Sequence, residues 1–466
     1  MKNLKKLGAL LLALTLILSL GATAFADGEA TLPTGDAAGA FAEQDTPIAQ
    51  NKTLRIYKSI LAYNADSLDV AAPTITYSYS IEAGSAGKTV TDETSDHATG
   101  TAVSTTTLAG VVTDLTMTSQ TNSTAAASTT LKWEAANDIL KTGSDDTAAV
   151  TAANADGAGN KKYVDINFSN VVFGATGVYR YKLTEAIDGT DTYSASGVTD
   201  DGSNVRYLDV YVKPAATGYN NGSTAAEWEI YGYALFIEDG DVTSATAKTT
   251  GFVDYSVTSG TDTVTYGDKY YTYNVSITKN IEGDPSMVAV GHQFPFSVKF
   301  TNAAITKAVK IGEATLQAPV TSARTPAAAA LPLEINSTLG ADLKIGENTS
   351  GCGTIRYIGV PVGTKVEVQE KNDVAGTTYS LVTKVDTAGA SAAALIAYNA
   401  NSAVTELAAP TANENDTVSH AVTFTNTLAL SSPTGVVLRV APYVLMLAAG
   451  IVLFVLSRKR RSREEV

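Results

Sequence analysis

Short stretches in which apolar and polar residues alternate are the feature that most constrains how this chain folds. Residues 164–168 read VDINF, so that apolar side chains fall on every second position. This period of two is typical of a β-strand with one buried face. The same alternation occurs at 177–185, 205–212 and 228–237, and no extended helical period occurs between 51 and 428. The sequence therefore predicts an all-β protein.

Two regions are poor in large apolar residues. Residues 84–130 and 140–160 are rich in Thr, Ser, Ala and Gly, which favours long loops or short edge strands. An additional binding function hidden within residues 84–160 is an open alternative.

The N-terminal residues have the pattern of a secretory signal. Three lysines among residues 1–6 precede an apolar run at 7–20, and Ala24-Phe25-Ala26 supplies a small-x-small cleavage site. We expect a signal peptide at 1–26 and a flexible leader at 27–50. A membrane anchor is the alternative, but the apolar run is short for one.

The C-terminal residues 429–466 contain a second pattern. An apolar stretch at 440–456 is followed by a basic cluster, and at 1.5 Å per residue it would extend roughly 25 Å as a helix, enough to span a membrane. A short motif precedes it: Ser432, Pro433, Thr434 and Gly435. The three parts together resemble a cell-wall sorting signal, which a sortase cleaves between Thr and Gly. A tail-anchored membrane protein is the alternative. A similar motif at 32–35 has no apolar span after it, and we interpret it as coincidence.

Charge and composition exclude several classes of protein. The formal net charge is −14, which argues against nucleic acid as a partner. The single cysteine, Cys352, excludes an intrachain disulfide. The three histidines are scattered without metal-ligand spacing, so we expect neither a metal nor another cofactor.

A weak internal repeat divides the central region into two units, at 51–256 and 257–428. Each unit has a strand-like segment ending in lysine, a glycine-preceded strand ending in glutamate, and a closing segment with Phe, any residue, then Asp or Asn. The paired positions are Lys58 and Lys279, Glu185 and Glu370, and Asp254 and Asn426.

These motifs resemble those of the streptococcal major pilins of the T-antigen type. The match covers nearly the whole region between the two signals, and GVYRYKLTE at 177–185 and VTFTNT at 422–427 resemble the family's motifs closely. The resemblance implies two tandem Ig-like β-sandwich domains. Each would hold an isopeptide bond, assisted by a buried glutamate: Lys58 to Asp254 with Glu185, and Lys279 to Asn426 with Glu370. Asp254 departs from the family's usual asparagine, so this bond would release water instead of ammonia.

Physical chemistry explains why these residue types suit such a bond. Burial should lower the pKa of a lysine and raise that of a carboxyl group, which yields a neutral nucleophile and a neutral acid. A glutamate can then act as general acid and base, while the fold holds the reacting atoms together. The reaction is autocatalytic with a single turnover, so the protein is not an enzyme in the ordinary sense. Solvated strand ends and surface ion pairs are the alternative reading of the same residues.

The resemblance implies a structural subunit of a sortase-assembled pilus, secreted and covalently anchored to the cell wall. Its expected partners are pilus-specific and housekeeping sortases, further copies of itself, minor pilins, peptidoglycan and a possible host-surface ligand. The predicted acceptor for Thr434 of the next subunit is Lys248, with Lys213 as the alternative. A monomeric wall-anchored adhesin or stalk is the alternative function. A secreted hydrolase is disfavoured because no further catalytic cluster is evident.

Overall fold

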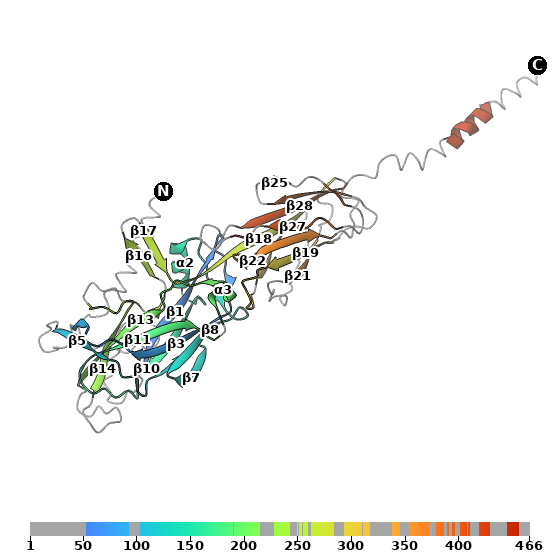
Figure 1. Cartoon of the computed structure of the whole chain (residues 1–466). Helices are drawn as coiled ribbons and strands as arrows, with labels where there is room; N and C mark the ends of the chain where they lie inside the picture. Colours follow the sequence, from blue (N-terminus) through green and yellow to red (C-terminus); the bar gives the residue numbers. More distant parts are fainter. Residues whose placement is uncertain are drawn as a thin grey trace, which may run out of the picture.

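We describe the protein from a computed structural model. The residues whose structure is described are 53–92, 103–155, 157–189, 191–214, 228–242, 249, 251–253, 255–259, 262–283, 293–309, 311–316, 338–344, 354–371, 379–385, 389–390, 394–396, 401–407, 409–410, 419–428 and 445–455. Most of them form two β-rich bodies that lie end to end (Figure 1).

The first body is a β-sandwich. One of its sheets has the strand order β1 (Thr53–Asn64), β10 (Lys161–Asn167), β6 (Thr116–Ser119) and β7 (Asn122–Ala126), with β15 (Gly251–Phe252) parallel to β1. The facing sheet has the order β14 (Trp228–Phe236), β13 (Val205–Pro214), β11 (Gly177–Ile187), β3 (Ile75–Ala83) and β8 (Ser128–Trp133). Apolar side chains from both sheets form one core, with Trp133, Tyr181 and Ile56 among its buried members.

Shorter elements complete the first body. The strand β5 (Val103–Ala109) pairs with β11 and with β4 (Thr89–Asp92), while β2 (Val70–Ala71) pairs with β9 (Ile139–Leu140). The remaining elements are the helices α2 (Asp146–Ala153) and α3 (Tyr193–Ser196), the strand β12 (Val198–Thr199), and the hairpin of β16 (Tyr255–Ser259) and β17 (Asp262–Tyr266).

The second body is also a β-sandwich. Its first sheet runs β20 (Gly312–Leu316), β22 (Thr354–Pro361), β18 (Asp268–Gly283), β28 (His420–Leu428) and β24 (Tyr379–Val385), with β25 (Gly389–Ala390) and β26 (Ala394–Ile396) beside β24. The facing sheet runs β21 (Thr338–Lys344), β19 (Gln293–Thr301), β23 (Lys365–Glu370) and β27 (Thr405–Leu407). The predicted all-β fold with two tandem sandwiches is therefore confirmed.

Strand β18 belongs to both bodies. Its first residues pair in parallel with the end of β1, and its later residues pair with β22 and β28 (Figure 1). Tyr270 is buried in the first core, whereas Tyr273 is buried in the second. The two cores thus divide within a single continuous strand.

The stretches with alternating apolar and polar residues form strands, and their apolar side chains face the core. In β10, Val164 and Ile166 are buried while Asp165 between them is partly exposed. The helix α2 is an element that the composition did not indicate. Its eight residues are too short for a clear helical period, and its start is fixed by Asp145, whose side chain accepts a hydrogen bond from the backbone N–H of Ala148.

Residues 445–455, within the predicted membrane-spanning segment, are helical. Within the part of the chain that the structure describes, no helix has both the length and the apolar character needed to cross a membrane.

Candidate functional site

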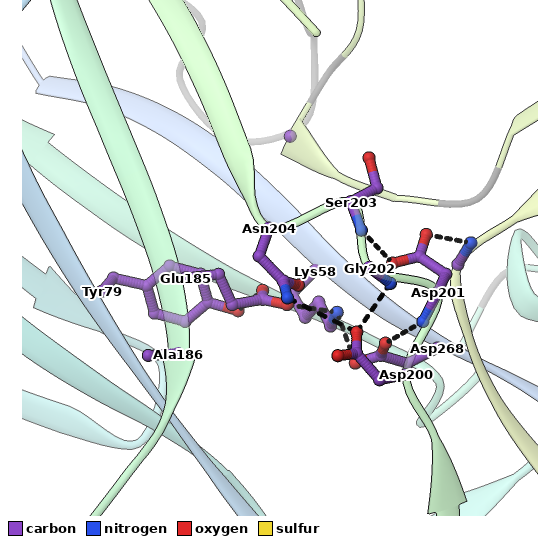
Figure 2. A network of polar contacts seen from close by, with 12 residues as sticks. Lys58, Tyr79, Glu185, Ala186, Asp200, Asp201, Gly202, Ser203, Asn204 and Asp268 are labelled. Carbon is purple, nitrogen blue, oxygen red and sulfur yellow. Dashed lines mark hydrogen bonds and ion pairs between the residues drawn. The ribbon is translucent and has the colours of Figure 1, made fainter.

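A buried cluster of one lysine and two carboxyl groups lies in the first sandwich. The Nζ atom of Lys58 is 2.7 Å from Oε1 of Glu185 and 2.8 Å from Oδ2 of Asp268. Lys58 is 3% exposed, Glu185 2% and Asp268 0%. Figure 2 shows the lysine and the two carboxyl groups in contact at the centre of the network.

The strand pattern explains why these charged groups meet inside the core. Lys58 lies on β1 between Ile56 and Ile60 in the alternation, and both isoleucines are buried, so the lysine also faces inward. Glu185 faces it from β11 in the opposite sheet. Asp268 is the first residue of β18 and pairs with Ile60, two positions beyond the lysine.

Aromatic rings and a loop enclose the cluster. Lys58 Nζ lies 4.6 Å from the centroid of the Tyr77 ring. The backbone N–H of Asp201 faces Asp268 Oδ1 at 3.4 Å, and the Asp201 carboxylate accepts a hydrogen bond from the backbone of Gly267 at 2.6 Å (Figure 2). The loop around Asp201 therefore covers the side of Asp268 that faces away from the lysine.

The environment shifts the protonation of both Glu185 and Lys58. Burial, with help from Asp268, raises the pKa of Glu185 to about 7, although Lys58 opposes this shift. Burial alone would lower the pKa of Lys58, but the charges of Asp268 and Glu185 outweigh it and raise that pKa above its ordinary value. The pKa of Glu185 is raised, as we expected for a buried carboxyl group. The expected lowering of the lysine pKa is wrong for Lys58.

The second sandwich holds an equivalent cluster with an amide in place of the acid. Lys279 Nζ lies 3.0 Å from both carboxylate oxygens of Glu370. The Nδ2 atom of Asn426 donates to Oε1 of Glu370 at 2.7 Å. All three residues are 0% exposed. The Oδ1 atom of Asn426 is buried, and no hydrogen-bond partner for it is present among the described residues.

The two clusters occupy the same position in their β-ladders. In the first, Ile60 follows Lys58 by two residues and pairs with Asp268 across the parallel ladder of β1 and β18. In the second, Ile281 follows Lys279 by two residues and pairs with Asn426 across the parallel ladder of β18 and β28. A side chain two positions further along a strand lies on the same face, so each lysine has an acid or amide diagonally beside it.

Asp268 is a site residue that sequence reasoning missed, and the ladder explains why. Lys58 pairs with Phe252 of β15, just as Lys279 pairs with Phe424 of β28. The Phe of the Phe-x-Asp/Asn pattern is therefore the residue that pairs with the lysine in both sandwiches. However, β15 ends at Phe252, the hairpin of β16 and β17 follows, and β18 begins beside Ile60.

Asp254, the predicted partner of Lys58, lies outside the described residues. The sequence signal that could have indicated Asp268 is its position at the start of the strand that also carries Lys279.

The close approach of β15 to β1 requires a glycine. Gly251 has a φ of +148°, and a Cβ atom there would lie 2.1 Å from the backbone oxygen of Tyr57. The buried guanidinium of Arg206 donates to the backbone oxygen of Gly251 at 2.9 Å. These contacts hold Phe252 beside Lys58, as part of the wall of the site.

The sequence-predicted assembly residues are not placed by the structure. Ser432, Pro433, Thr434, Gly435 and Lys248 lie outside the described residues. Lys213 lies in β13, where only its backbone is described.

Among the described residues, one group of three carboxylates has the spacing of cation ligands. Oxygen atoms of Asp200, Asp201 and Asp268 lie within 4.8 Å of one another. They accept hydrogen bonds from Lys58, from the backbone N–H of Gly202 in the loop, and from the backbone N–H of Gly267 just before β18. The lysine and the loop therefore account for this grouping.

Fold and clusters together define a class of structure: tandem all-β sandwiches, each with a lysine, a glutamate and an acid or amide buried at one ladder position. Comparisons with solved structures find similar chains among bacterial surface proteins. The T3.2 major pilin of Streptococcus pyogenes matches with 16% sequence identity and a TM-score of 0.36, covering 81% of this chain and 98% of that one. Another major pilin of Streptococcus pyogenes matches with 17% identity and a TM-score of 0.36, covering 81% and 99%.

An adhesin of Mobiluncus mulieris that contains intramolecular disulfide, isopeptide and ester bond cross-links matches with 12% identity and a TM-score of 0.22, covering 81% of this chain and 99% of that one. No protein-family model and no curated protein matches the chain. At these identities and TM-scores, function has to be inferred from the geometry of this chain's own residues.

Proposed function

We propose that this protein is the structural subunit of a sortase-assembled surface pilus, stabilised by two intramolecular isopeptide bonds. The bonds join Lys58 to Asp268 and Lys279 to Asn426. The observation that carries this proposal is the pair of fully buried clusters at equivalent ladder positions. An ion pair that serves stability alone gains little from such burial, because desolvation offsets the attraction between the charges.

The first bond forms from the state in which Glu185 is protonated. The proton of Lys58 moves to Asp268 Oδ2, which lies 2.8 Å away, and leaves a neutral amine beside a neutral acid. Nζ attacks Cγ of Asp268 and forms the C–N bond. Glu185 then donates a proton to the departing hydroxyl and takes one from the nitrogen. The C–O bond breaks, one water molecule leaves, and Glu185 ends protonated as it began.

The second bond follows the same sequence with a different leaving group. The proton of Lys279 moves to Glu370, 3.0 Å away, and the neutral amine attacks Cγ of Asn426; the C–N bond to the original amide nitrogen then breaks. Glu370, which already contacts both partners, transfers protons to that nitrogen, and ammonia leaves. A protonated Glu370 can also donate to the Oδ1 atom of Asn426, which otherwise lacks a partner among the described residues.

The two bonds would provide a covalent route for tension through both sandwiches. A pull that enters at β1 passes from Lys58 to Asp268, runs along β18 to Lys279, and leaves through Asn426 on β28. The residues enclosed between the bonded pairs are then bypassed and cannot be extended. A fibre exposed to shear needs this property in every subunit.

Assembly would use the residues predicted from the sequence. A sortase would cleave after Thr434 of the motif Ser432–Gly435 and join Thr434 to Lys248 of the next subunit, with Lys213 as the alternative acceptor. The basic and apolar residues at 440–461 would hold the precursor at the membrane until this transfer. The polymer would end on peptidoglycan and carry minor pilins, as the motif resemblance implies.

Mass spectrometry and immunoblotting test the two halves of this proposal. The purified protein without its signals should weigh about 35 Da less than its sequence predicts, since water and ammonia have both left. A mass equal to the sequence mass would refute both bonds. Wall extracts should show a ladder of covalent multimers, whereas a single band would refute the pilus and indicate a monomeric adhesin or stalk.

A further inference from the structure

A tyrosine hydroxyl contacts the glutamate in each cluster. We propose that Tyr79 is a positioning residue for bond formation, which holds the acid proton of Glu185 on the oxygen that faces Lys58. At the second site, the hydroxyl of Tyr379 contacts Glu370 on the oxygen that also accepts from Asn426, so we assign the positioning role to Tyr79 alone. This inference rests on the proposed cross-linking chemistry and adds one residue to it in the first domain.

At the first site, the two oxygens of Glu185 have different partners. Oε1 lies 2.7 Å from Lys58 Nζ, and Oε2 accepts a hydrogen bond from the Tyr79 hydroxyl at 2.5 Å. Tyr79 is directly opposite Glu185 in the antiparallel ladder of β3 and β11, and it is 1% exposed. Its ring packs 5.5 Å from that of Phe252, so the hydroxyl has little freedom to move away.

At the second site, the tyrosine comes from a different part of the fold. Tyr379 donates to Oε1 of Glu370 at 3.3 Å, and it lies on β24, next to the strand that carries Asn426. Tyr79, in contrast, lies next to the strand that carries the glutamate. Both clusters therefore have a tyrosine hydroxyl on the glutamate, but only at Glu185 does it contact the oxygen that faces away from the lysine.

The chemical consequence follows from hydrogen-bond directionality. While the Tyr79 hydroxyl donates to Oε2, that oxygen acts as the acceptor, and the acid proton of Glu185 resides on Oε1. Oε1 is the oxygen beside the reacting amine, so the proton is where the departing hydroxyl needs it. Without the tyrosine hydroxyl, the proton can occupy either oxygen, and the carboxyl group is held less firmly.

The test is the variant Tyr79→Phe, with Tyr270→Phe as its matched control. Tyr270 is also fully buried and lies two residues from Asp268, but its hydroxyl has no hydrogen-bond partner among the described residues. Full-length chains are dissolved from inclusion bodies in denaturant, checked by mass to be uncross-linked, and refolded by dilution. Samples are quenched over time, and the cross-linked fraction is read from the mass of the peptide pair that contains Lys58 and Asp268.

We expect Tyr79→Phe to slow bond formation on the order of tenfold, the loss of about one hydrogen bond. Tyr270→Phe should form the bond at the wild-type rate. Circular dichroism of each refolded variant checks that the fold is retained.

The pH dependence of the rate of bond formation distinguishes a positioning role of Tyr79 from a contribution to fold stability alone. Glu185 is faced by Lys58 from β1, by Asp268 from β18 and by Tyr79 from β3, and it also interacts electrostatically with Tyr77 and Tyr193. Since the Tyr79 hydroxyl favours the ionised form of Glu185, its removal should move the pH at which the rate declines upward. Tyr270→Phe should leave that pH unchanged.

The outcomes are distinguishable. If wild-type protein cross-links and Tyr79→Phe matches it in both rate and pH profile, the positioning role is refuted while the isopeptide proposal stands. If wild-type protein never loses mass, the cross-linking proposal fails and this inference fails with it.

Discussion

Asparagine substitutions can identify which aspartate is joined to Lys58, because an isopeptide bond made from Asn is chemically identical to one made from Asp. Cross-linked Asp268→Asn loses ammonia where the wild type loses water, and the two products have the same mass. If Asp254 is not bonded, Asp254→Asn gives a product about 1 Da lighter than wild type, the ordinary difference between the two residues. High-resolution mass spectrometry of the peptide pair containing Lys58 makes this comparison.

The stability that the proposed bond between Lys58 and Asp268 would contribute can be calculated from its place in the chain. Lys58 and Asp268 are 210 positions apart, and closing a loop of that length removes entropy from the unfolded chain worth about 5 kcal/mol. For a domain of this size, we expect Asp268→Ala to lower the midpoint of thermal unfolding by about 10–20 °C. Lys58 would still pair with Glu185 in this variant, so no charge is left buried without a partner.

Asp254→Ala is the matched control for this measurement, and we expect it to keep both the bond and the midpoint. Calorimetry of the two alanine variants and the wild type measures the shift. Loss of the bond in Asp254→Ala together with its retention in Asp268→Ala would refute the assignment of Asp268.

Three further predictions follow from the same sites. Glu185→Ala and Glu370→Ala should each abolish one bond, seen as mass deficits of about 17 and 18 Da respectively in place of about 35 Da, and full cross-linking in either variant would contradict the glutamate's role. The rate of the first bond should fall as pH rises above about 7, because the pKa of Glu185 lies there and its protonated form is the reactive one; a rate that increases with pH in refolding time courses would argue against this order of proton transfers. Lys248→Ala should reduce the pilus ladder to monomer on immunoblots while both internal bonds still form, whereas a persisting ladder would direct attention to Lys213.

The strand pattern predicted much of this fold because alternation is a local property. The stretches around Val164 and from Gly177 to Glu185 form β10 and β11, and the segments ending in Lys58 and Glu370 lie in β1 and β23. Burial of these lysines and glutamates follows from their position in the alternation. An inward-facing charge within an otherwise apolar face is readable from sequence and is unusual enough to indicate a site.

The remaining features depend on contacts between distant segments. Asp268 meets Lys58 because the parallel neighbour of β1 changes from β15 to β18 after Phe252, and no local pattern reveals such a change. The same holds for Tyr79, whose role is visible only in its pairing with Glu185. The domain boundary predicted after residue 256 stays a prediction. The two hydrophobic cores change over within β18, between Tyr270 and Tyr273.

The strand β18 would explain why the two proposed bonds suffice for the described part of the molecule. Once both bonds form, the stretch from Asp268 to Lys279 is the main-chain segment between them that no cross-link bypasses. It is also held from several sides, since it pairs with β1, β22 and β28. In its middle, the buried Asn274 donates to Asn64 of the first sandwich at 2.8 Å and accepts from the backbone N–H of Gly359 in the second at 3.2 Å. The segment between the two proposed bonds, which would transmit tension through its own backbone, is therefore one that both sandwiches hold in place.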